Sequence, residues 1–157
     1  RPRRLFNRPA GALAAAAVAV YLLVVVGATA SLADAAEACS TWPVCSGAAS
    51  DPAVAVALGH RALAVVTGLV LLAAVLAVFL TEAPRRVKRG DGGLALYPAQ
   101  IGFGALLATT AGSPPVPGLH LGVGLAIFGT FVLALAWQLE YETGGTDEPF
   151  APEEVEP

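Results

Sequence analysis

Four long runs of apolar residues dominate the chain, and short polar or charged segments separate them. The runs extend over residues 10–33, 53–80, 94–112 and 118–139. Each is close to the roughly 20 residues that an α-helix needs to cross a hydrocarbon core of about 30 Å. None alternates apolar and polar residues with period two, as a membrane-spanning strand does. The pattern therefore predicts an all-α integral membrane protein, a bundle of four transmembrane helices.

The order of segments repeats along the chain. Each half reads as a helix, an outer loop, a helix with a histidine near its start, and a polar segment, so we expect two helical hairpins in a pseudo-repeat. Of the 157 residues, 56% are hydrophobic and 13% are charged, a balance typical of a membrane protein. The lipid bilayer is the expected surrounding, and the charge pattern suggests no nucleic-acid partner.

Basic residues gather in two segments, 1–8 and 85–89, whereas the loop 34–52 carries acidic residues and no Lys or Arg. The positive-inside rule then places both termini on the cytoplasmic side of the plasma membrane and the loop 34–52 outside. Residues 140–157 are acidic and proline-rich, so we expect a disordered tail after a membrane domain of residues 1–139. The excess of Arg over Lys and the acidic tail suit a halophilic archaeal source.

The chain has two histidines, His60 and His120, and each lies just inside an apolar run that points from outside to inside. An ionisable side chain is costly in a bilayer, so each is a functional candidate. Two imidazoles entering from the same side can ligate one haem iron, of b, o or a type; the alternative is a hydrogen bond between helices. The neighbouring Arg61 can meet a haem propionate or a lipid phosphate.

Helical spacing puts each histidine on a face with small and apolar residues. These faces, which can wall a flat macrocycle or simply pack helices, comprise His60, Ala64, Thr67 and Leu71, and His120, Gly124, Ile127 and Phe131.

Cys39 and Cys45 enclose five residues in the loop predicted to face the oxidising side. This placement favours a disulfide over a metal site. Two roles stay open: a redox-active dithiol, and a staple that shapes the loop around Trp42 and Pro43.

Three motifs in order resemble a known family. Cys39-Ser-Thr-Trp-Pro-Val-Cys45 resembles the C-P-D-W-P-L-C outer loop of the haem A synthases, and His60-Arg61 resembles their haem-ligand H-R pair. Residues 100–128 are similar to their segment Q-x-x-x-G-x-L-x-x-x-T-G-x-P-P followed by L-H-L, which carries a second ligand onto His120. The resemblance covers residues 10–139, the length of one half of an eight-helix member or of a short archaeal member. A chain of this length would pair with a copy of itself or be half of a larger protein.

This resemblance implies an oxidoreductase that converts the C8 methyl of haem O to the formyl of haem A for terminal oxidase assembly. His60 and His120 would be axial ligands, Arg61 a propionate partner, and Cys39–Cys45 an outer disulfide. The chain departs from the family at Ala57, where a glutamate is expected, and at Ser31 and Ala33, where an arginine and a threonine are expected.

Two further functions stay open. The first, favoured by the missing glutamate, is a non-catalytic haem-binding module, fused to or partnering a haem O synthase. The second sets the resemblance aside and takes the chain as a thiol-redox membrane protein in which Cys39 and Cys45 are the working pair.

Overall fold

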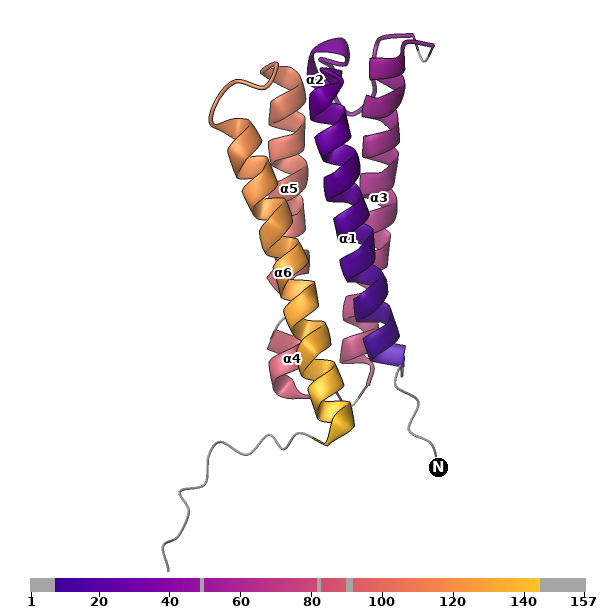
Figure 1. Cartoon of the computed structure of the whole chain (residues 1–157), viewed down its shortest axis with the longest axis vertical. Helices are drawn as coiled ribbons and strands as arrows, with labels where there is room; N and C mark the ends of the chain where they lie inside the picture. Colours follow the sequence, from indigo (N-terminus) through magenta and orange to yellow (C-terminus); the bar gives the residue numbers. More distant parts are fainter. Residues whose placement is uncertain (1–7, 49, 82, 90–91, 145–157) are drawn as a thin grey trace, which may run out of the picture.

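The computed structural model describes residues 8–48, 50–81, 83–89 and 92–144, and all regular structure in these ranges is helical. Four long helices run side by side, with a short helix at each end of the bundle (Figure 1). The elements are α1 (Arg8–Leu32), α2 (Ala35–Ala38), α3 (Pro52–Phe79), α4 (Arg85–Arg89), α5 (Gly92–Thr109) and α6 (Val116–Thr143). The prediction of an all-α protein is confirmed.

Within the described residues, three helices are long and apolar enough to cross a membrane, which makes this a multi-pass membrane protein. These spans are Pro9–Leu32 in α1, Pro52–Phe79 in α3 and Val116–Thr143 in α6. The predicted span 94–112 corresponds to α5, which does not reach this standard. It has 18 residues, and Tyr97, Pro98 and Gln100 lower its mean hydropathy.

Local signals explain where α3 begins. The carboxylate of Asp51 accepts a hydrogen bond from the backbone N–H of Ala53 at 2.9 Å, which satisfies one of the free donors at the helix N-terminus. Pro52 follows at the first helical position, where a missing N–H costs nothing. The observed start lies within one residue of the expected start at 53.

The end of α6 lies beyond the expected end at 139. The helix continues to Thr143 and stops at Gly144, whose φ of 96° is the left-handed conformation that glycine adopts most readily. Within the last turns, Gln138 Nε2 donates to Glu142 Oε1 at 2.8 Å. The first residues of the predicted tail are therefore helical, and residues 145–157 lie outside the described part of the chain.

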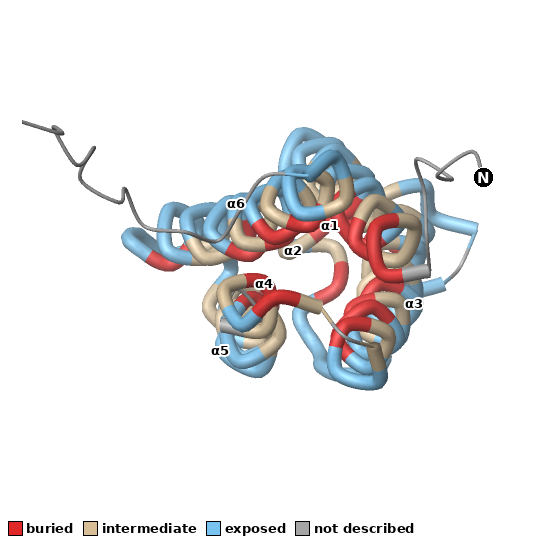
Figure 2. Tube along the Cα trace, turned by 90° about the horizontal axis from the view of Figure 1, so that it is seen from below, coloured by how far each residue is buried: buried red, intermediate tan, exposed pale blue. Residues whose placement is uncertain are grey.

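The long helices form a ring of neighbours. α1 packs against α3 on one side and α6 on the other, α5 packs on α6, and a smaller contact between α3 and α5 closes the ring. Figure 2, a view along the bundle, shows α1 between α3 and α6, with the buried positions turned toward the middle. The chain therefore makes two helix pairs, α1 with α3 and α5 with α6, joined through α1 and α6.

An apolar core fills the half of the bundle nearest α4. It contains Leu13, Ala16, Ala17, Val20, Leu71, Ala74, Val75, Val78, Val87, Ile127, Phe131 and Ala134. The two helix faces predicted from the sequence point inward here, because Thr67, Leu71, Ile127 and Phe131 are each at most 1% exposed. The histidines lie nearer the opposite end, outside this core.

The two ends of the bundle differ in charge. The basic helix α4 lies at the end where α1 begins and α6 stops (Figure 1), and Arg86 Nη2 contacts Glu140 Oε2 at 3.2 Å. The cysteine loop and the turn between α5 and α6 lie at the other end. The fold thus collects the basic segment at one end and the predicted chemistry toward the other.

Candidate functional site

His60 lies in the third turn of α3, and its ring packs directly on α1 at Gly27. A Cβ built on Gly27 would lie 3.1 Å from His60 Cε1 and 3.7 Å from Nδ1. Because few Cβ contacts are this close, the ring occupies space that only glycine leaves open. Small residues in membrane helices permit such close approach. Gly27 therefore provides the space that the His60 imidazole occupies.

His120 lies in the second turn of α6 and repeats this arrangement on the other helix pair. A Cβ built on Gly104 of α5 would lie 3.3 Å from His120 Cε1 and 3.8 Å from Nδ1. In both pairs, then, a glycine on the first helix supports the histidine ring of the second helix.

Both imidazoles lie close to the same stretch of α1. His60 packs on Gly27, and a Cβ built on Gly124 would lie within 4 Å of both Gln100 Nε2, which neighbours His120, and Val24 Cγ2, about one turn before Gly27. Both rings are half-buried, and both Nδ1 atoms are buried without a hydrogen-bond partner among the described residues. Buried polar atoms are nearly always paired, so an exception marks a place where a ligand can complete the site.

Gln100 is the polar neighbour that α5 adds to this site. Its Nε2 lies 3.4 Å from His120 Nε2, and its Oε1 is buried without a hydrogen-bond partner in the described part of the chain.

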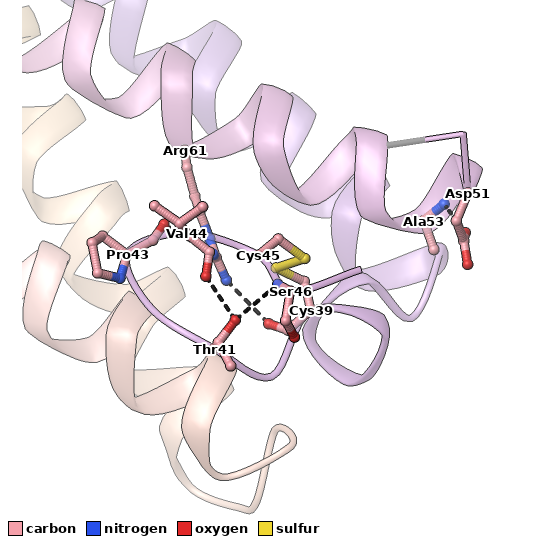
Figure 3. Close-up of a disulfide and its surroundings, with 9 residues drawn as sticks. All are labelled: Cys39, Thr41, Pro43, Val44, Cys45, Ser46, Asp51, Ala53 and Arg61. Atoms are coloured by element: carbon pink, nitrogen blue, oxygen red, sulfur yellow. Dashed lines mark hydrogen bonds between the residues drawn. A yellow bond between two sulfur atoms is a disulfide. The ribbon is translucent and has the colours of Figure 1, made fainter. Parts of the chain in front are cut away.

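Arg61 is turned toward the cysteine loop (Figure 3). Its Nη1 donates to the carbonyl of Pro43 at 3.0 Å, and its Nη2 donates to the carbonyl of Cys39 at 3.1 Å. A guanidinium has five N–H donors, so these two bonds leave others for a further acceptor. Arg61 therefore ties the outer loop to the helix that carries His60.

The loop also contains the Cys39–Cys45 disulfide, with a Cα–Cα distance of 5.2 Å. Cys39 is 1% exposed and packs with Ala35 and Ala57 in a small apolar cluster. Thr41 Oγ1 donates to the carbonyl of Val44 across the loop. A buried sulfur in a loop held on several sides favours the staple over the working redox pair. Ala57, which replaces the glutamate of the resembled motif, lies under this staple.

Replacing Arg61 with Lys is expected to loosen the cysteine loop. A single ammonium cannot span the two carbonyls of Cys39 and Pro43 as the guanidinium does, so at least one hydrogen bond to a charged group is lost. Such a bond contributes about 1.5–3 kcal/mol, which corresponds to at least about tenfold faster amide exchange in residues 40–46. Hydrogen–deuterium exchange with mass spectrometry measures this. Arg85→Lys, at the opposite end of the bundle, should leave the loop unchanged, and equal exchange in both variants would contradict the prediction.

The chain is 51% identical over 148 residues to protoheme IX farnesyltransferase 1 of Natronomonas pharaonis, which covers 94% of this chain and 32% of that protein. It is 50% identical over 141 residues to the protoheme IX farnesyltransferase of Haloarcula marismortui, covering 88% of this chain and 30% of that protein. The chain is homologous to a part of these archaeal farnesyltransferases. It spans about a third of the length of the curated relatives that it matches. No protein-family model and no solved structure matches the chain.

This similarity overturns the prediction of a haem A synthase and of its methyl-oxidising activity. The error has a physical origin. The motifs that carried the resemblance are a cysteine-bracketed loop, a histidine beside an arginine, and a second histidine after a tight turn. Each describes how a loop is closed or how an imidazole is placed in a membrane, and none of them contains a group specific to one reaction.

Sequence reasoning singled out both histidines, Arg61 and the two cysteines, and it missed the partners of the rings. Gly27 and Gly104 are two of the chain's 17 glycines, and Gln100 is the first residue of the motif over 100–128. Their spacing along the chain does not show which glycine meets a ring, because that depends on how the helices are aligned. Gln100, a polar residue within an otherwise apolar helix, was the one available signal.

Proposed function

We propose that the chain is a haem-binding membrane module of a protein in which protoheme IX is farnesylated, with His60 and His120 as the axial ligands of one haem iron. The observation that carries this proposal is the pair of glycine-supported imidazoles close to the same stretch of α1, each with a buried nitrogen that has no partner among the described residues. Homology to part of the archaeal farnesyltransferases supplies the link to protoheme.

The donor set fits haem. Neutral imidazole is a common axial ligand of haem iron, and it needs a free nitrogen lone pair that faces the metal. The described residues contain no cluster of three or more His, Cys, Asp or Glu that would suit another metal ion. Arg61 follows His60 directly, and its remaining N–H groups suit a propionate at the outer edge of the macrocycle.

Two imidazoles on one iron leave no open coordination position. Haem held in this way would carry electrons or be stored and presented, and it would not activate oxygen while both ligands stay bound. His60 and His120 would hold the porphyrin, and the apolar helix faces would exclude water from it. We place this chain as the part that holds haem for a farnesylating unit, supplied within a longer chain or by a partner.

The proposed topology has four spans, with α5 as the fourth, arranged as two hairpins in pseudo-repeat. The equivalent Gly27–His60 and Gly104–His120 contacts support the repeat. The basic helix α4 lies at the same end of the bundle as the start of α1 and the end of α6, and the positive-inside rule makes this the cytoplasmic end, with the Cys39–Cys45 loop facing outward. The polar Gln100 of α5 lies against His120. The low mean hydropathy of α5 therefore comes in part from a residue that faces the bundle.

An absorption spectrum of the purified chain loaded with haem tests the proposal. We expect one haem per chain. After reduction, the spectrum should show the sharp α band of a low-spin, six-coordinate iron. The reduced haem should not bind carbon monoxide, because both axial positions are filled. A high-spin spectrum that shifts on carbon monoxide addition, or no haem binding at all, would contradict bis-imidazole ligation.

A further inference from the structure

His120 makes a polar contact that His60 does not share in the described structure. Gln100 Nε2 lies 3.4 Å from His120 Nε2, and one turn further along α5, Gly104 lies against Cε1 and Nδ1 of the same ring. The helix α5 therefore contacts this imidazole at two points. His60 has the equivalent glycine, Gly27, but its Nδ1 has no hydrogen-bond partner among the described residues.

Gln100 is itself held in place. A Cβ built on Gly124 of α6 would lie 3.1 Å from Gln100 Nε2 and 3.8 Å from Val24 Cγ2 of α1. The amide thus lies in the interior, where α1, α5 and α6 meet. Gly124 is buried, and it leaves the space that the amide occupies. The side chain is confined on two sides, as expected for a group that orients its neighbour.

The two ends of this amide offer opposite hydrogen-bonding chemistry. Nε2 is a donor and Oε1 an acceptor, and a turn about the last side-chain bond exchanges their places without moving the rest of the residue. Oε1 is buried and has no hydrogen-bond partner among the described residues. An imidazole that ligates a metal through one nitrogen keeps its proton on the other, and that N–H is almost always donated to a fixed acceptor.

We propose that Gln100 is a positioning residue for His120. With the two ends of the amide exchanged, Oε1 accepts the N–H of His120 Nε2, which fixes the tautomer and leaves the lone pair of Nδ1 for iron. This inference rests on the proposed haem-binding function. It makes the two axial ligands unequal, because His120 is oriented by a side-chain acceptor and His60 by packing on Gly27 alone. The ring that Gln100 holds is therefore the more rigid ligand.

Gln100→Leu tests this inference, since leucine has a similar size and no acceptor. Loss of an outer-shell partner costs roughly 10- to 100-fold in metal affinity, so we expect haem to dissociate about that much faster or bind that much more weakly. The reduced variant should also bind carbon monoxide, because a loosened His120 leaves the iron open part of the time. Gln100→Glu keeps an acceptor and should remain closed to carbon monoxide.

Gln138→Leu is the matched control. Gln138 is 1% exposed and lies on α6 like His120, but its amide donates to Glu142 near the far end of the helix. The Gln138→Leu variant should bind haem as the unaltered chain does, whatever the effect of the substitution on the melting temperature. Reaction with carbon monoxide separates a positioning role from a general loss of stability, because destabilisation alone does not open a coordination position.

Two outcomes would overturn the inference. Unchanged haem affinity and no carbon monoxide binding in Gln100→Leu would show that His120 needs no acceptor. Tighter binding in Gln100→Leu would show that the amide competes with iron for the ring nitrogen. Either result leaves the proposed function standing if the unaltered chain still gives a low-spin spectrum. Absence of that spectrum in the unaltered chain is the separate failure of the proposed function itself.

Discussion

Replacing His60 or His120 with alanine is expected to abolish the low-spin haem spectrum. Each change removes one of the two proposed axial ligands, so the remaining imidazole leaves the iron five-coordinate at best. We expect haem affinity to fall by more than about 100-fold, beyond the cost of losing an outer-shell partner. Alanine is the strongest helix former, so α3 and α6 should form as before.

The measurement is the absorption spectrum of the reduced protein together with its haem-to-protein ratio. Leu119→Ala is a suitable control, because Leu119 neighbours His120 on α6 and is 47% exposed. This variant should keep both the spectrum and the haem content. A low-spin spectrum that persists in both histidine variants would remove these residues as ligands and end the proposal.

Much of the fold follows from sequence pattern alone. Long apolar runs predict helices because the hydrocarbon core leaves no other way to satisfy backbone hydrogen bonds. The predicted faces around Thr67 and Phe131 do point inward, since helical spacing decides which residues share a face. Whether α5 is apolar enough to span a membrane was harder to predict. Tyr97 and Gln100 lower its hydropathy, and their contacts with other helices become visible only in the folded bundle.

The candidate site is less predictable than the fold. A histidine within an apolar run is conspicuous because of its cost in lipid. Its surroundings come from other helices, so Gly27 could not be assigned to His60, nor Gly104 to His120, before the helices were aligned. Arg61 shows the same limit. Sequence indicates a cation beside the first histidine, whereas only the structure shows that the cation holds the carbonyls of Cys39 and Pro43.

The overturned family prediction follows the same logic. The resemblance rested on residues that place an imidazole and close a loop, and proteins with different reactions share these needs. Ala57 already departed from the resembled family at the position of its carboxylate. In the structure, this alanine is 7% exposed and packs with Cys39, so its side chain supports the cysteine loop. A missing reactive group therefore carried more functional information than the conspicuous matches around it.

Replacing Gly27 or Gly104 with leucine is expected to displace the imidazole that each glycine supports. A Cβ alone would lie 3.1 Å from His60 Cε1 at Gly27, and 3.3 Å from His120 Cε1 at Gly104. The larger leucine side chain cannot fit there unless the ring or the helix moves. Overpacking of this kind costs about 1–3 kcal/mol, so we expect roughly fivefold to hundredfold weaker haem binding.

Two glycines on the same helices provide matched controls for these variants. Among the described residues, and apart from their own helix backbone, Gly11 on α1 and Gly102 on α5 have no heavy atom within 4 Å of a built Cβ, so leucine there should leave haem binding unchanged. Haem titration followed by absorption measures the affinity of all four variants. Because the controls change the same helices by the same residue, they separate a crowded ring from a general effect of leucine. Equal affinity in all four variants would show that the glycine contacts do not position the ligands.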